Sequence, residues 1–221
     1  MTAGGAGHRY RALLVDYGGV MTTSVSVSFA EFCTAHGVHP DQLAKLLGTA
    51  YSASIPEGGE RNLVHAIETG EIPLEEFNRR LAETLSEGLA QPLEPAELGA
   101  RLFAGSKPDQ RMVDAVKAAR RHGLKTGLVS NTWGPSSAPE WLGDVFDAVV
   151  LSGDERVRKP QPEIYRIAAE RVGVDAEACA FVDDIPANVE GARAVGMAGV
   201  LHRDAAITIP KLEELFGFTL S

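Results

Sequence analysis

The sequence predicts an α/β fold, with helices on both faces of a parallel β-sheet and a helical segment inserted after the first strand. Short apolar runs alternate with helical patterns through the second half of the chain. Alternation at these lengths is typical of crossover units, which bring successive strands parallel to one another. Residues 23–105 instead show helical patterns without a convincing strand. We therefore expect a three-layer core and a small α-helical cap.

Five apolar runs are predicted to form the strands. The first covers residues 10–16, and the others are residues 125–130, 147–152, 179–184 and 198–202. Helices are expected over residues 108–123, 162–173 and 186–196. Each of these segments opens with a proline and ends at a glycine, which is the usual order of start and stop signals in a helix.

The predicted domain division assigns residues 1–22 and 106–221 to the α/β core and residues 23–105 to the α-helical cap. Within the cap, residues 28–37, 73–85 and 95–103 have helical patterns. Phe29, Phe32 and Phe77 are expected to form the cap's own apolar core. A surplus of apolar residues there leaves a homodimer open as an assembly.

The amino-acid composition and charge limit the classes of molecule that this protein is expected to bind. The 221 residues carry a net charge of -9, which argues against a nucleic-acid or anionic-membrane partner because neither would find a basic surface. The two cysteines, Cys33 and Cys179, are far apart and have no metal-binding spacing; Cys179 adjoins an apolar run and is expected to be a buried thiol. We find no apolar stretch of membrane-spanning length and no secretory signal, so the expected location is cytoplasmic.

Polar residues follow several of the predicted strands at the point where each ends. In an open parallel sheet, ligands bind beyond the carboxyl ends of the strands, so these residues are expected at one edge. Asp16 stands at the end of the first predicted strand, and Lys159 follows the third predicted strand after a loop. The remaining polar residues at strand ends are Ser130, Asn131, Thr132, Asp183 and Asp184.

Three carboxylates at one edge of a sheet would repel one another unless a cation lies among them. Mg²⁺ is the expected cation because it prefers oxygen ligands and binds through a few carboxylates together with substrate phosphate. Lys159 would add positive charge, and Ser130 could hold phosphoryl oxygens. Gly18 and Gly19 would let the backbone approach the reacting group. Each residue alone has a plainer interpretation as a helix cap, a turn or a solvated side chain.

Four segments of the sequence, in their order along the chain, resemble the motifs of the haloacid-dehalogenase-like hydrolase superfamily. The segments are "VDYGGV", "LVSNTW", "VRKPQPEIY" and "FVDDIPANVEGARAVGM", and the resemblance spans residues 10–202. It implies a Rossmann-like core, and the helical insert stands where the superfamily carries its C1 cap. The fourth segment is especially similar to the branch that contains the phosphatase domain of soluble epoxide hydrolases and small bacterial sugar-phosphate phosphatases.

The resemblance also implies a hydrolysis in two steps with a small phosphorylated molecule as substrate. Asp16 would form a covalent aspartyl intermediate that water then cleaves. Ser130 and Lys159 would orient the substrate and offset its charge. Substrate contacts are expected from the loop that carries Asn131, Thr132 and Trp133.

The resemblance implies a Mg²⁺ site at Asp16, Asp184 and the carbonyl of Gly18. Asp183 would bind the ion through water or tune the site. Asn188 matches a supporting position that other members of the superfamily fill with Asp.

Gly18 departs from the superfamily's usual pattern. Most of its phosphatases carry a second Asp two residues after the nucleophile, as a general acid and base. Loss of such a group lowers a rate by roughly 10² to 10⁴. The loss matters less when the leaving group is a weak base, such as a halide or an acidic phosphate.

Three functions are compatible with these residues, and a phosphatase is the leading one. A haloacid dehalogenase would need neither a leaving-group acid nor a metal, but the Asp183–Asp184 pair suits a cation. A catalytically silent member would bind a phosphorylated ligand or a protein partner. A phospho-acceptor receiver domain is set aside because its acidic pair precedes the acceptor, whereas here the pair comes last.

Three further residues are secondary candidates. Trp141 is expected to pack in a core or interface. Glu57 and Glu60 lie in residues 51–62, which are interpreted as a solvated cap loop.

Overall fold

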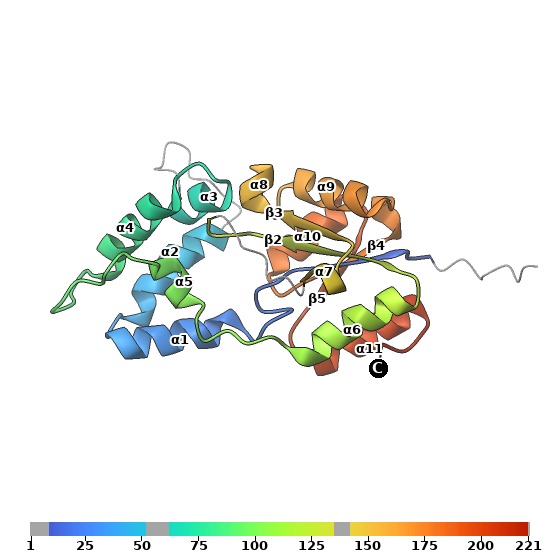
Figure 1. Cartoon of the computed structure of the whole chain (residues 1–221), viewed down its shortest axis with the longest axis horizontal. Helices are drawn as coiled ribbons and strands as arrows, with labels where there is room; N and C mark the ends of the chain where they lie inside the picture. The colour runs from blue at the N-terminus through green and yellow to red at the C-terminus, as the bar shows by residue number, and fades with distance from the viewer. Residues whose placement is uncertain (1–8, 52–61, 135–141, 221) are drawn as a thin grey trace, which may run out of the picture.

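The computed structural model describes residues 9–51, 62–134 and 142–220, and these form a three-layer α/β core with a helical insert beside it (Figure 1). The predicted fold class is confirmed. Trp141, Glu57 and Glu60 lie outside the described residues. The five strands of the described sheet are β1 (Ala12–Val15), β2 (Lys125–Ser130), β3 (Ala148–Leu151), β4 (Cys179–Asp183) and β5 (Ala198–Leu201).

The strands lie in the order β3-β2-β1-β4-β5, and every neighbouring pair is parallel. The first strand in the sequence therefore lies at the centre, between β2 and β4. In the register, Val15 pairs with Leu128 on one side and with Val182 on the other. This central position brings the residue after β1 close to the ends of both neighbours.

The alternation of side chains along β1 divides the core into two layers. Leu13 and Val15 pack into the cluster under α6 (Gln110–Arg121), α7 (Leu142–Val145) and α11 (Ala205–Phe216). Ala12 and Leu14 face the opposite side, toward α9 (Pro162–Val172) and α10 (Pro186–Ala194). Because both faces are covered, the whole strand is apolar rather than alternating in polarity.

The helix boundaries follow the predicted signals closely. The side chain of Asp109 caps α6 by accepting hydrogen bonds from the backbone N–H groups of Arg111 and Met112. Pro162 and Pro186 stand in the first turns of α9 and α10. At the end of α9, Gly173 adopts φ 69°, a left-handed conformation that glycine takes without a Cβ clash.

Between β1 and α6 the chain forms α1 (Val25–His36), α2 (Pro40–Tyr51), α3 (Leu63–Glu68), α4 (Leu74–Leu85) and α5 (Leu98–Leu102). We call α1 to α5 the helical insert. Phe29, Phe32 and Phe77 are buried in one apolar cluster within it, as predicted. The exact domain boundaries at residues 22 and 106 stay a prediction.

The structure adds elements that the sequence patterns did not single out. These are α2, α3 and α11, together with the short segments α7, α8 (Ser152–Glu155) and η1 (Ala176–Ala178). Cys33 and Cys179 are both buried and free, and burial was predicted for Cys179. Across the described ranges, we find no helix with the length and apolar character needed to cross a membrane.

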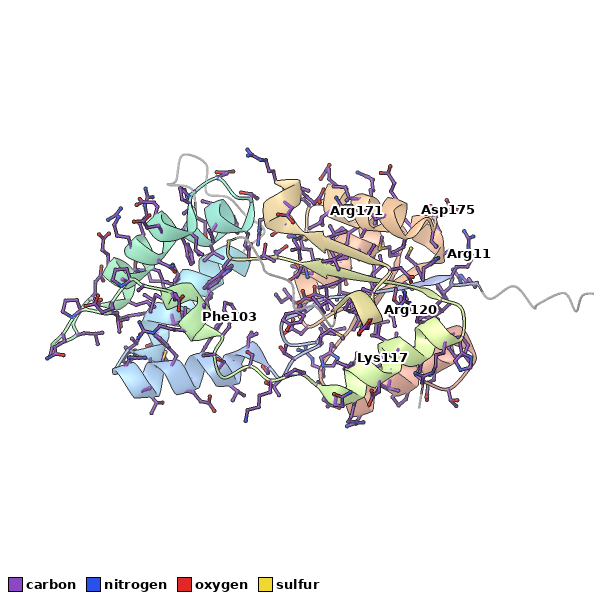
Figure 2. All side chains as sticks on the ribbon, in the orientation of Figure 1. Arg11, Phe103, Lys117, Arg120, Arg171 and Asp175 are labelled. Atoms are coloured by element: carbon purple, nitrogen blue, oxygen red, sulfur yellow. The ribbon has the colours of Figure 1, made fainter. Side chains whose placement is uncertain are left out.

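The helical insert lies beyond one end of the sheet, and the other end is marked by an exposed ion pair. Figure 2 shows Arg11 and Asp175 at the end of the core that lies away from the insert; their side chains are 3.4 Å apart. Arg11 immediately precedes β1, so this end holds the amino ends of the strands. The carboxyl ends therefore point toward the insert, on the side where Phe103 lies.

Candidate active site

Asp16 stands directly after the central strand, at the edge that faces the helical insert. Its backbone N–H donates to the carbonyl of Val182 at 2.9 Å, so the residue is held by the β1–β4 ladder. Its side chain is nearly buried. A carboxylate in such a place is costly unless opposite charge compensates it.

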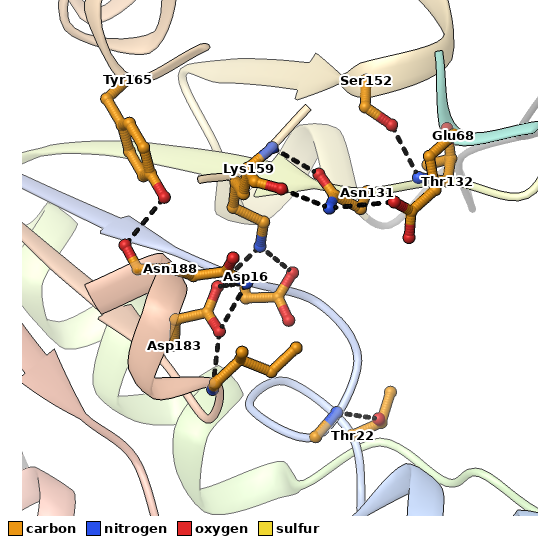
Figure 3. A network of polar contacts seen from close by, with 12 residues as sticks. Asp16, Thr22, Glu68, Asn131, Thr132, Ser152, Lys159, Tyr165, Asp183 and Asn188 are labelled. Atoms are coloured by element: carbon orange, nitrogen blue, oxygen red, sulfur yellow. Dashed lines mark hydrogen bonds and ion pairs between the residues drawn. The ribbon is translucent and has the colours of Figure 1, made fainter. Parts of the chain in front are cut away.

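The compensating charge is Lys159, whose side chain is only 1% exposed. Its Nζ lies 2.6 Å from Asp16 Oδ1 and 2.7 Å from Asp183 Oδ2 (Figure 3). Burial alone would lower the pKa of Lys159, but the two carboxylates reverse that effect and raise it. The ammonium group is therefore held charged between two acids that come from different strands.

Asp183 is fully buried, and both its oxygens accept hydrogen bonds from the protein. Oδ1 accepts from the backbone N–H of Ile185 at 2.9 Å and from Asn188 Nδ2 at 3.1 Å. Oδ2 accepts from Asn188 Nδ2 at 3.1 Å and from Lys159 Nζ. Because a carboxylate offers about four lone-pair positions, these contacts occupy Asp183. This arrangement favours the positioning role for Asp183 over direct metal ligation.

Asp16, Asp183 and Asp184 form a carboxylate cluster in which one oxygen from each lies within 4.8 Å of the others. Burial raises the pKa of Asp184 to about 6, and the charge of Asp183 adds to the rise while Lys159 opposes it. Burial likewise raises the pKa of Asp16, against the pull of Lys159. One lysine does not neutralise three acids, so this oxygen-only donor set fits a hard divalent cation.

The glycines after Asp16 have different surroundings. Gly19 has φ +77°, and a Cβ built on it would lie 2.5 Å from Asp184 Oδ2. The bare backbone therefore makes room for the Asp184 carboxylate. A Cβ at Gly18 would meet Val25 Cγ1 at 3.4 Å, which is an ordinary contact, so position 18 has space for a side chain.

A cavity of about 610 Å³ opens beside Asp16, between the strand ends and the insert. Ser130, Thr132, Trp133 and Gly18 line it. Trp133 packs edge-to-face against the insert's Phe77 and Phe103, with ring centroids 5.1 and 5.0 Å away. The predicted phosphate-binding serine and the predicted aromatic flank therefore share one cavity.

Asn131 also lines this cavity, yet its amide is used to hold Lys159. Its Oδ1 accepts from the backbone N–H of Lys159 at 2.9 Å, and its Nδ2 donates to the carbonyl of Lys159 at 3.2 Å (Figure 3). A substrate contact was predicted for Asn131. Its observed contacts fix the backbone that carries the lysine.

Glu68 and Arg158 join the insert to the site, and neither was predicted from the sequence. Arg158 Nε lies 2.5 Å from Glu68 Oε2, and both side chains are at most 10% exposed. Asn131 Nδ2 is 3.4 Å from the same Glu68 oxygen. Burial raises the pKa of Glu68, and the charge of Arg158 opposes that rise. Glu68 stood in no recognisable motif, whereas Arg158 lies in the motif segment "VRKPQPEIY" directly before Lys159, and that position was the available signal.

Thr132 fixes the neighbouring turn. Its backbone N–H donates to the hydroxyl of Ser152 at 2.9 Å, and its own hydroxyl accepts from the backbone N–H of Gly153 at 3.4 Å. The loop after β2 is therefore tied to the start of α8.

This geometry can be compared with known proteins. A family model described as haloacid dehalogenase-like hydrolase matches residues 10–196. The chain is a haloacid dehalogenase-like hydrolase. The family resemblance read from its four motifs is thereby confirmed, as is the assignment to hydrolases.

Two curated relatives and one solved structure illustrate the family. Phosphatase MT3486 of Mycobacterium tuberculosis (strain CDC 1551 / Oshkosh) is 38% identical over 134 residues, which is 58% of this chain and 61% of that protein. Bifunctional epoxide hydrolase 2 of Rattus norvegicus is 27% identical over 183 residues, 78% of this chain and 33% of that protein. The chain thus spans less than two thirds of either relative.

The solved structure is a predicted HAD-like family hydrolase from Porphyromonas gingivalis. It superposes with a TM-score of 0.64 at 22% identity, covering 94% of this chain and 98% of that one. At this identity the likeness concerns the fold, which it supports over nearly the whole length of this hydrolase.

Proposed function

We propose that this hydrolase is a Mg²⁺-dependent phosphatase that acts on a small phosphomonoester through an aspartyl-phosphate intermediate. The observation that carries the proposal is the pair formed by Asp16 and Lys159, 2.6 Å apart and both buried beside two further carboxylates. The name of the mycobacterial relative, a phosphatase, supports the same direction.

The metal would be held by Asp16, Asp184 and the carbonyl of Gly18, with Asp183 acting through its contacts to Lys159 and Asn188. When bound, Mg²⁺ supplies positive charge that offsets the substrate phosphate and favours the ionised form of the carboxylates. The three carboxylates lie together, and Gly18, two residues after Asp16, lines the cavity.

The first step requires an ionised Asp16. Its carboxylate attacks phosphorus, the bond between phosphorus and the leaving oxygen breaks, and the leaving group departs. Lys159 stays charged and orients the Asp16 carboxylate. Ser130, which lines the cavity at the end of β2, would bind a phosphoryl oxygen.

In the second step, water attacks the phosphorus of the aspartyl phosphate. The bond between phosphorus and the Asp16 oxygen breaks, which releases inorganic phosphate and restores the carboxylate. The proton of the attacking water passes to solvent or phosphate, since position 18 carries no side chain to accept it.

The test is hydrolysis of 4-nitrophenyl phosphate with Mg²⁺ and with EDTA. We expect turnover only with the metal, and its loss in Asp16→Asn. Asp114→Asn is the matched control because Asp114 lies on the exposed face of α6. Equal rates with EDTA, or an active Asp16→Asn, would contradict the proposal.

Two further assays on the same protein test the alternative functions, a dehalogenase and a catalytically silent member. Chloride release from a 2-haloacid without metal would identify a dehalogenase. Binding of a phosphate ester without turnover of either substrate would identify a silent member. The cytoplasmic location and the homodimer stay predictions, which fractionation and light scattering would test.

A further inference from the structure

The walls of the cavity beside Asp16 are mostly apolar. Six of the described lining residues come from the core and from the insert, and together they surround the space that a leaving group would enter: Val25, Leu74, Phe103, Leu128, Trp133 and Leu142. The polar residues Ser130, Asn131 and Thr132 lie at the end of β2 and just after it, and the other polar lining residues are Tyr17, Thr22, Asn78, Glu97 and Ser106. A polyhydroxylated leaving group would lose hydrogen bonds to water against the apolar walls.

The cavity is also poor in proton donors for a departing oxygen. Gly18 lines it and presents no side chain, although a Cβ there would be only in ordinary contact with Val25. Among the lining residues that the structure describes, Glu97 alone carries a carboxyl group, and it lies exposed just before α5. Tyr17 also lines the cavity, and a phenolic hydroxyl is a weak acid.

From these two features together we propose that the substrate is a phosphate monoester whose leaving group is apolar and weakly basic, with an aryl phosphate as the simplest case. The inference rests on the proposed phosphatase function and names its substrate class. A leaving group that is stable as an anion needs no acid at position 18, and an aromatic ring can pack against the apolar side chains that line the cavity, among them Trp133 and Val25.

The reaction balances without a protein acid. The Asp16 carboxylate forms a bond to phosphorus while the bond between phosphorus and the aryl oxygen breaks. The electron pair of that bond leaves with the phenolate, which takes a proton from solvent after departure. The ordinary pKa of a phenol is about 10, so a phenolate is a far weaker base than the alkoxide of a sugar.

The first experiment measures kcat/KM with Mg²⁺ for phenyl phosphates of similar size, from 4-nitrophenyl through 4-cyanophenyl to unsubstituted phenyl, and for a sugar phosphate. We expect the rate to fall by roughly 10²-fold along the phenyl series, as for a reaction without general acid catalysis. The sugar phosphate should be slower still. In Gly18→Asp, the series should become flatter.

A flat series in the natural protein would overturn the inference. If the series then steepened in Glu97→Gln, Glu97 would be the proton donor. A sugar phosphate that reacts as fast as 4-nitrophenyl phosphate would also overturn it, while leaving the phosphatase proposal intact. Failure to hydrolyse any ester would instead count against the proposed function itself.

A second experiment tests the apolar walls separately from the chemistry. Val25→Asn should raise KM about tenfold for 4-alkylphenyl phosphates. Inhibition by inorganic phosphate should stay the same, because the apolar side chain of Val25 offers no group that binds an anion. Unchanged KM values would contradict an aryl group in this cavity. Weaker inhibition by phosphate would mean that Val25→Asn disturbs the whole site. The experiment would then be repeated with Val25→Thr, because the Thr side chain has nearly the shape of Val.

Discussion

Gly19 and Asp184 are in contact across the site, with the position of a Gly19 Cβ only 2.5 Å from Asp184 Oδ2. The two residues come from different ends of the chain, one after β1 and the other after β4. Asp184 keeps its place beside Asp16 because position 19 has no side chain and adopts φ +77°. The sequence motif of two glycines after Asp16 thus has a steric reason as well as a conformational one.

The first prediction concerns Gly19→Ala. The added methyl group would displace the Asp184 carboxylate, so we expect Mg²⁺ affinity to fall at least tenfold, and the left-handed backbone would cost about 1 kcal/mol of stability. Gly88→Ala is the matched control. Gly88 has φ +82° with no described atom within 4 Å of its Cβ, so it should show the strain alone.

Calorimetric titration with Mg²⁺ and urea unfolding would separate the two effects. The same metal affinity in Gly19→Ala and in Gly88→Ala would mean that Asp184 does not hold the ion. The same loss of stability in both would attribute the destabilisation to the backbone conformation.

The second prediction concerns pH, in the absence of metal. Burial raises the pKa of Asp184 from 3.8 to about 6, so between these values the folded state binds more protons than the unfolded state. The free energy of unfolding therefore falls as pH rises through this window. The elevated pKa of Asp16 acts in the same direction.

Urea unfolding at a series of pH values with EDTA would test this dependence. Other carboxyl groups also titrate here, so the useful quantity is the difference between the natural protein and Asp184→Asn. That difference should grow in favour of the variant as pH rises from 4 to above 6, and saturating Mg²⁺ should reverse it, because the ion would bind the natural protein more tightly than a variant without the Asp184 carboxylate. A difference that stays constant with pH would refute the elevated pKa.

The sheet, its two helical layers and the gathering of Asp16, Lys159, Asp183 and Asp184 could be predicted because they depend on local signals. Each strand is a continuous apolar run, and parallel pairing then sends every strand end to one edge. Both the strands and the edge at which their carboxyl ends meet could therefore be predicted from the sequence.

The contacts between the insert and the site could not be predicted in the same way. Glu68 lies 90 residues before Arg158, and their pairing depends on how α3 packs against α8. The double contact of Asn131 with the Lys159 backbone likewise requires the path of the loop before α9. Such pairings are set by tertiary packing, which leaves no periodic signal in either segment.

The third prediction concerns the ion pair between Glu68 and Arg158. Glu68→Gln would leave the buried Arg158 charge with less compensation, so we expect the free energy of unfolding to fall by roughly 3 kcal/mol. Glu83→Gln is the control, because Glu83 pairs with Arg79 on an exposed face of α4 and should cost less than about 1 kcal/mol. Similar costs in urea unfolding would mean that the buried pair contributes little.

The last prediction concerns Asn131, for which the sequence predicted a substrate contact. Asn131→Asp retains the oxygen that accepts from the Lys159 backbone N–H at 2.9 Å. It replaces the donor to the Lys159 carbonyl with an oxygen and places a negative charge near Glu68. The backbone that carries Lys159 should then shift away from Asp16.

Misplacement of a catalytic group by about 1 Å costs on the order of 10²-fold in rate, so we expect kcat on 4-nitrophenyl phosphate to fall by about that factor while KM changes little. Asn131→Ala provides the comparison. It removes both contacts without adding charge, so its kcat should fall less than that of Asn131→Asp. If KM rises in both variants while kcat is retained, the side chain binds substrate, as the sequence suggested. The ratio of the two effects therefore separates positioning of Lys159 from direct contact with the substrate.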